Sequence, residues 1–123
     1  MIVGFPARLL LPSFESVTDI EMGTAVAGYL VEAYDAKLNG EELAQAAHRV
    51  QLAVETLARE GTAVRFVHAI AIPGDDTCFL LYEAPTPDVV GEVNRRAAIS
   101  FDRVVEVQHV SPERLKRQLE RRL

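Results

Sequence analysis

The most constraining feature of this sequence is the order in which strand-like and helix-like hydrophobic patterns follow one another. Four segments rich in β-branched and aromatic residues are predicted to be strands: residues 27–34, 63–72, 77–84 and 101–110. One helical pattern lies between the first two strands and another lies between the last two. With right-handed crossovers, this order predicts an α+β, ferredoxin-like β-α-β-β-α-β fold with an antiparallel sheet of order 4-1-3-2.

The predicted helices carry recognisable start and stop signals. Asn39 suits an N-cap, with Glu42 at the third helical position, and Gly61 is placed to end the first helix. Thr86 and Pro87 begin the second helix as N-cap and first residue. The apolar positions of the first helix recur every three or four residues, at Leu43, Ala47, Val50, Val54 and Leu57.

Two terminal segments flank this predicted domain, which spans residues 23–110. Residues 1–22 are predicted to be a loosely ordered arm, although their apolar stretch could instead pack on a partner subunit. Residues 111–123 are predicted to form a C-terminal helix, because Ser111-Pro112-Glu113 repeats the helix-start pattern. This tail carries five basic and two acidic residues, so it is a basic helix beside an acidic domain.

The predicted fold leaves one face of the sheet uncovered, because both helices lie on the other face. A small domain with an open, partly apolar sheet face is only marginally stable in water. Two copies packed face to face would bury this surface. We therefore expect a homodimer of the dimeric α+β barrel type.

Composition excludes several classes of function. The net charge of −5 argues against broad binding to nucleic acid, because phosphate binding needs a positive surface. No apolar run is long enough for a membrane span, and no convincing secretion signal is present. Cys78 is the single cysteine, and it is expected to be a buried structural thiol, since it lies in an apolar strand. These features predict a cytoplasmic protein that binds neither nucleic acid nor membranes.

Alternation along the strands predicts which side chains share a face. His68 and His109 fall in the more apolar set, which is expected to meet the helices. Glu32, Glu83 and Glu106 fall in the other set, which is expected to face the dimer cavity. Glu83 and Glu106 would then flank Gly28, whose missing side chain leaves room for a cation or a small hydroxylated ligand. The alternative is that these carboxylates form ion pairs at the dimer rim, and one bulge would reverse the facing.

The histidines give little independent evidence of a metal site. His68 and His109 lie on the two predicted edge strands, roughly 14 Å apart, so one subunit cannot use both on one ion. His48 is expected at the surface of the first helix. No H-x-H, H-E-x-x-H or C-x-x-C spacing occurs.

Four segments nevertheless resemble a known family: YLVEAY, RFVHAIAIPGDDTCFLLYEAPTPDVV, NRRAA and FDRVVEV. They are similar to a family of small nickel-binding proteins from bacteria, in particular actinobacteria, which have a ferredoxin-like fold. Much of this family is labelled only as a domain of unknown function. The resemblance covers residues 28–110. It matches Glu32, His68, Arg96 and the pair Asp102-Arg103 to the family's residues.

The resemblance implies Ni²⁺ or another divalent transition metal as ligand, with His68 as the metal-binding residue. This sequence also departs from the family, with Asn94 where many members have His, Leu80 where many have Cys, and Ala69 where many have Ser. The first two departures remove an imidazole and a thiol, which are good donors for nickel.

Together these observations predict a non-enzymatic homodimeric binding protein that holds a small ligand or a transition metal at the sheet. The expected ligand contacts are His68, Asn94, Arg103, Glu32, Glu83 and Glu106. The alternative is a cofactor-free monooxygenase or isomerase, with His68 and either Tyr34 or Glu83 in acid/base roles. A third possibility is a regulatory partner protein that acts through its tail or its arm.

Overall fold

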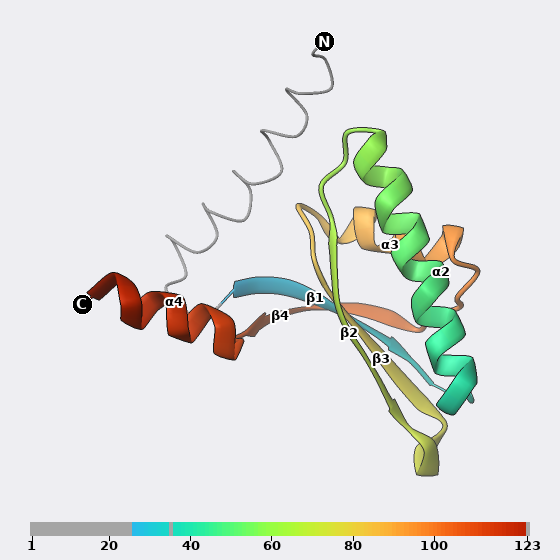
Figure 1. Cartoon of the computed structure of the whole chain (residues 1–123). Helices are drawn as coiled ribbons and strands as arrows, with labels where there is room; N and C mark the ends of the chain where they lie inside the picture. Colours follow the sequence, from blue (N-terminus) through green and yellow to red (C-terminus); the bar gives the residue numbers. More distant parts are fainter. Residues whose placement is uncertain (1–25, 35, 123) are drawn as a thin grey trace.

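The computed structural model describes residues 26–34 and 36–122 of the chain. Its elements follow the predicted order (Figure 1). They are β1 (Val26–Ala33), α2 (Gly40–Arg59), β2 (Arg65–Ile72), the short 3₁₀ helix η1 (Pro73–Asp75), β3 (Thr77–Glu83), α3 (Pro87–Arg96), β4 (Arg103–His109) and α4 (Pro112–Arg122).

The four strands form one antiparallel sheet in the order β2-β3-β1-β4. This is the predicted order 4-1-3-2 counted from the opposite edge, so the ferredoxin-like α+β fold is confirmed. Both α2 and α3 lie on the same side of the sheet (Figure 1). The sheet places the first and last strands of the domain next to each other, so residues about 70 positions apart in sequence pair directly, as Glu32 does with Arg103.

The hydrophobic core lies between this face of the sheet and the two helices. Val31 on β1 and Leu80 and Tyr82 on β3 are at most 1% exposed. The helices contribute mainly small and β-branched residues, which allow close approach to the sheet: Ala46, Val50, Ala53, Val54, Leu57, Val90 and Val93. Burying one such valine or leucine side chain stabilises the fold by about 1.5–3 kcal/mol, so this packing holds the domain together.

The helix boundaries agree with the sequence signals in all but one contact. The Thr86 hydroxyl accepts a hydrogen bond from the Val89 amide at 3.4 Å, as expected of an N-cap. Gly61 has a φ of +96°, the left-handed conformation that ends many helices. Asn39 occupies the N-cap position of α2 in extended conformation, but its side chain makes no capping hydrogen bond. The predicted capping bond at Asn39 is therefore wrong, although the helix begins where it was expected.

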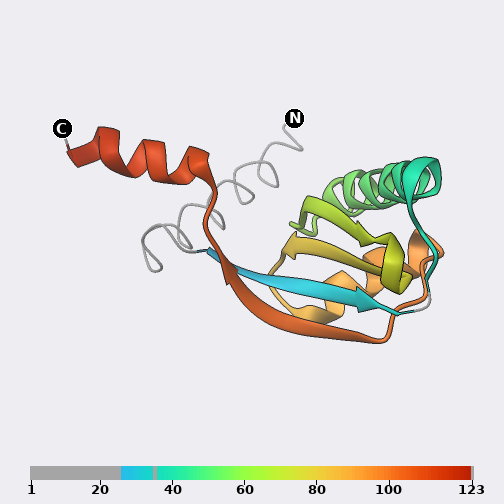
Figure 2. The same cartoon turned by 90° about the horizontal axis from the view of Figure 1, so that it is seen from below.

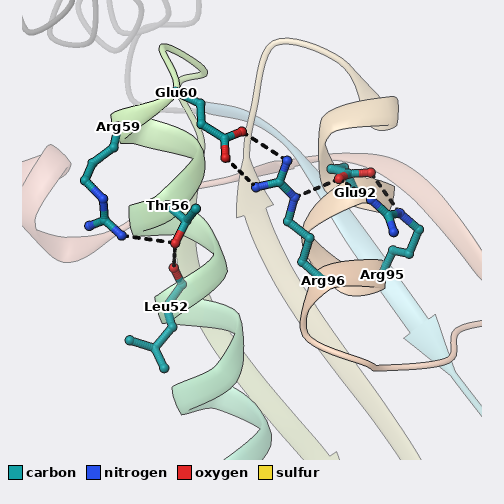
Figure 3. Close-up of polar contacts among 7 residues, drawn as sticks. All are labelled: Leu52, Thr56, Arg59, Glu60, Glu92, Arg95 and Arg96. Atoms are coloured by element: carbon teal, nitrogen blue, oxygen red, sulfur yellow. Dashed lines mark hydrogen bonds and ion pairs between the residues drawn. The ribbon is translucent and has the colours of Figure 1, made fainter.

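Ionic contacts join the ends of the two core helices. The Arg96 guanidinium on α3 donates to both carboxylate oxygens of Glu60, just after α2, at 3.0 Å each. It also donates to Glu92 at 2.7 Å, and Arg95 contacts the same carboxylate (Figure 3). Hydrogen bonds from Arg95 and then Arg96 lower the pKa of Glu92 to about 2. Arg96, one of the residues matched to the family, therefore has a structural role here.

Helix α4 extends away from the sheet and from the two core helices (Figure 2). The Ser111 hydroxyl accepts from the Arg114 amide at 3.2 Å, which caps the helix as its sequence predicts. Leu115 and Leu119 on α4 are 44% and 62% exposed. The side chain of Arg114 is the exception on this helix, because it is buried.

The predicted arm, residues 1–22, lies outside the described residues. Within the described part of the chain, no helix is both long enough and apolar enough to cross a lipid bilayer.

Candidate functional site

The sheet face opposite α2 and α3 carries an apolar surface, which we call the open face. Strand pairing places five half-buried apolar side chains on it: Leu30, Phe79, Leu81, Val105 and Val107. Ile70 and Ile72 extend this surface along the edge strand β2 and are 50% and 41% exposed. No helix of residues 26–34 and 36–122 packs over this face (Figures 1 and 2).

A bulge in β2 brings His68 onto the open face. Phe66 pairs with Tyr82, but the next paired residue is His68, opposite Leu81, so Val67 is an extra residue. Phe66 packs on the core, whereas His68 is exposed on the other face. The expectation that His68 faces the helices is therefore wrong. The bulge presents its imidazole to solvent on the surface proposed for dimer formation.

Strand β4 also has the opposite facing to the one predicted. Val104 pairs with Val31 and packs against the core, which puts Val105, Val107 and His109 on the open face. Glu106 pairs with the core-facing Tyr29, so it lies on the helix side and is exposed. Glu106 therefore does not share a face with Glu83, and the expected pair of carboxylates flanking Gly28 does not form.

At one end of the open face, Glu83 is surrounded by two arginines and a histidine. Its carboxylate is 2% exposed and accepts hydrogen bonds from Arg114 Nη2 at 3.3 Å to each oxygen. Arg65 Nη1 donates to the same carboxylate at 3.3 Å. His109 Nε2 is fully buried and lies 3.1 Å from Glu83 Oε2, without an aligned hydrogen bond. We call these four residues the Glu83 cluster, and it attaches α4 to the sheet.

Gly28 lies beneath this cluster. A Cβ atom at Gly28 would come within 2.5 Å of the Tyr82 carbonyl oxygen and 3.3 Å of His109 Cδ2. Glu83 is next to Gly28 across the sheet, as predicted, because Tyr29 pairs with Tyr82. The space above Gly28 is occupied by the His109 ring, however, so the gap expected there for a ligand is closed.

The burial of His109 predicts a pH-dependent stability. Burial lowers the pKa of His109, with further lowering by Arg114 and Arg65 and opposition from Glu83. His109 therefore binds a proton more readily in the unfolded chain than in the folded one. Its contribution to the free energy of unfolding is complete above about pH 6.5 and declines as pH falls through its folded-state pKa. We expect a lower urea midpoint at about pH 5 than at about pH 8. A His109→Gln chain should lose part of this pH dependence, and an unchanged slope would contradict the assignment.

At the other end of β1, Glu32 forms a second polar cluster. Its carboxylate is 7% exposed and accepts a hydrogen bond from Arg103 Nε at 2.9 Å and another from the Tyr34 hydroxyl. Asp102, which precedes β4, contacts the same end of β1, because its carboxylate accepts a hydrogen bond from the Tyr34 amide at 2.6 Å. Hydrogen bonds from Arg103 and then Tyr34 lower the pKa of Glu32, and the bond to Glu32 raises the pKa of Tyr34. At neutral pH the Glu32 carboxylate is therefore ionised and the Tyr34 hydroxyl is protonated.

Asn94 is remote from these clusters. It is fully buried on the helix side of the sheet, where its side chain donates to the Val90 carbonyl at 2.9 Å and accepts from the Tyr82 hydroxyl at 3.3 Å. His68 lies on the opposite face. The structure therefore does not bring Asn94 and His68 into one site, and Asn94 instead satisfies the buried hydroxyl of Tyr82.

The predicted site residues thus do not form one site. His68 is an exposed imidazole, whereas Glu83 and the Glu32–Arg103 pair lie in polar clusters at opposite ends of the sheet. Asn94 and Glu106 lie on the helix side. In residues 26–34 and 36–122, no three His, Cys, Asp or Glu side chains come together to hold a metal ion. Cys78 is buried in the core, and burial raises its pKa, which makes it a poor nucleophile, as expected. Sequence reasoning did not find Arg65 and Arg114 as partners of Glu83. The available signals were the strand alternation, which puts Arg65 on the same face as Glu83, and the position of Arg114 in the first turn of α4, shortly after β4.

Comparisons with known proteins agree with the fold. A family model described as nickel responsive protein SCO4226-like matches residues 29–107. The crystal structure of SCO4226 from Streptomyces coelicolor A3(2) is similar, with a TM-score of 0.52 and 28% sequence identity. That similarity covers 69% of this chain and 95% of the SCO4226 chain. No curated protein matches the sequence.

Proposed function

We propose that the chain, which belongs to the SCO4226-like family of nickel-responsive proteins, is a non-enzymatic binding protein that acts as a homodimer. The ligand would be held between the open faces of two copies. The observation that carries this proposal is the open face itself, an apolar sheet surface beside an exposed histidine. We expect it to act in the cytoplasm, which its single, buried cysteine supports.

The apolar character of the open face supports dimer formation. Ile70 and Ile72 are about half exposed, and they continue a row of apolar side chains across all four strands. Each Å² of such surface removed from water contributes about 25 cal/mol. A second copy related by a two-fold axis offers the same surface, and such an interface is complementary to itself.

The metal proposal also depends on the second copy. One copy supplies His68 but no cluster of three donors among its described residues, so a single chain does not fit a closed nickel site. Glu32 and Glu83 are already held by arginines. We therefore propose that a divalent transition metal would be bound by His68 together with donors from the second copy.

Calorimetric titration of the tag-free protein with Ni²⁺ tests this proposal. We expect saturable binding at micromolar concentration or tighter, and loss of that binding in His68→Ala. His48→Ala is the matched control, since His48 is an exposed histidine on α2 and its removal should leave binding unchanged.

Equal binding by His68→Ala and the native chain would contradict the assignment of His68. If the native dimer binds no metal at all, the nickel proposal fails for this chain. The open face would then be tested with small organic ligands and for turnover, which the enzymatic alternative predicts.

A further inference from the structure

A cavity of about 350 Å³ lies beyond the Glu32 end of the sheet, between α2, the end of β1 and the segment that joins α3 to β4. Its walls include three apolar residues, Leu38, Ile99 and Phe101, and two charged ones, Arg49 and Asp102. None of these five residues belongs to the open face. Cavities of this size accommodate small molecules, and a few polar groups in a partly apolar wall set their orientation.

Arg49 gives this cavity a positioned cation. Its Nε donates to the Ala97 carbonyl at 2.9 Å, and this bond fixes the plane of the guanidinium against the end of α3. Within residues 26–34 and 36–122, the two terminal nitrogens of Arg49 make no hydrogen bond or ion pair. A guanidinium held in this way presents a pair of donors whose geometry matches a carboxylate.

Asp102 gives the same cavity an anion. One carboxylate oxygen accepts from the Tyr34 amide at 2.6 Å, which fixes the side chain in the turn before β4. No cationic side chain of the described residues forms an ion pair with Asp102, and in particular Arg49 does not. Among the described residues, this cavity is therefore lined by a cation and an anion that form no ion pair with each other.

We propose that this cavity binds a small zwitterion, specifically an α-amino acid with an apolar side chain. Arg49 would receive the carboxylate and Asp102 the ammonium group. Leu38, Ile99 and Phe101 would contact the apolar side chain, and Phe101 is 38% exposed and available for such contact. A simple anion would meet repulsion from Asp102, and a simple cation would meet repulsion from Arg49. A ligand with both charges can pair with Arg49 and Asp102 at the same time.

The probe is L-leucine, titrated calorimetrically and in parallel by thermal shift. Two analogues isolate the charges: leucinamide lacks the carboxylate, and 4-methylpentanoate lacks the ammonium group. We expect leucine to bind and each analogue to bind at least about tenfold more weakly, because each loses a charge-assisted contact. Equal binding of leucine and 4-methylpentanoate would overturn the zwitterion proposal, as would the absence of leucine binding.

Two conservative variants test whether leucine binds in this cavity. Arg49→Gln keeps a donor for the Ala97 carbonyl but removes the charge, and Asp102→Asn keeps an acceptor for the Tyr34 amide. Each should weaken leucine binding about tenfold or more with an unchanged melting temperature. Arg59→Gln, at an exposed position on the same helix, should bind as the native chain does. If both cavity variants bind leucine normally, the site lies elsewhere and the proposal fails, whatever the outcome of the nickel titration.

Discussion

Replacing Arg114 by methionine is expected to lower the free energy of unfolding by about 3 kcal/mol. Glu83 sits on an inner strand of the sheet and is 2% exposed, and a methionine in place of Arg114 would still shield its carboxylate from water without pairing the charge. Of its partners among the described residues, its carboxylate would keep Arg65, whose side chain is about half exposed, and His109. The change would leave a buried charge largely uncompensated, and it would also detach the first turn of α4. Urea unfolding followed by circular dichroism measures the effect.

A double variant separates the ion pair from simple loss of packing. Glu83→Gln combined with Arg114→Met removes both charges, and it should recover a large part of the stability lost in Arg114→Met alone. Lys116→Met, at an exposed position on α4, should stay within about 0.5 kcal/mol of the native chain. An Arg114→Met chain as stable as Lys116→Met would show that the Glu83 cluster does not hold α4 to the domain.

Replacing Gly28 by alanine is expected to destabilise the domain by about 2–3 kcal/mol. The new Cβ would lie 2.5 Å from the Tyr82 carbonyl oxygen, which belongs to the neighbouring strand and cannot rotate away. It would also lie 3.3 Å from the His109 ring, which closes the Glu83 cluster from above. The strands β1 and β3 would have to separate locally, and their pairing is central to the sheet.

Gly74→Ala is the matched control for this change. Apart from Gly74 and its two chain neighbours, no atom of the described residues lies within 4 Å of the position that its Cβ would take, and Gly74 does not have a positive φ. Its unfolding midpoint should stay close to the native value. Removing the His109 ring in a Gly28→Ala chain should restore little stability, because the contact with the Tyr82 carbonyl remains. Similar midpoints for Gly28→Ala and Gly74→Ala would contradict the close approach at Gly28.

The order of elements could be predicted because it depends on local patterns. Periodicity located α2 and α3, and Thr86 and Gly61 marked helix ends through short-range geometry. The sheet order then followed from general rules on crossovers. The facing of β2 and β4 could not be predicted. In β2 both phases of the alternation are largely apolar, and the bulge after Phe66 shifts the alternation by one residue. In β4 the apolar pair Val105 and Val107 lies on the open face, so the more apolar side of that strand is not the side that meets the helices.

The candidate site was predicted only in part, because it depends on contacts between distant residues. Glu32 and Arg103 were both expected as ligand contacts, and they form an ion pair with each other. The partnership of Glu83 with Arg114 crosses 31 residues and joins the sheet to a helix that lies outside the segment matched by the family model. Asn94 was expected among the ligand contacts, at the position where many members of the resembled family have His. Its full burial beside Tyr82 shows instead a satisfied core amide.

The central claim, that two copies pair through their open faces, is tested most directly by sedimentation equilibrium. We expect the tag-free protein to have twice the 13.6 kDa mass of the chain. Ile70→Lys, which puts a charge on the open face without touching the core, should shift the mass to that of the single chain while the circular dichroism spectrum is kept. A native protein that sediments as a single chain at all concentrations would contradict the account, as would an Ile70→Lys protein that remains fully dimeric.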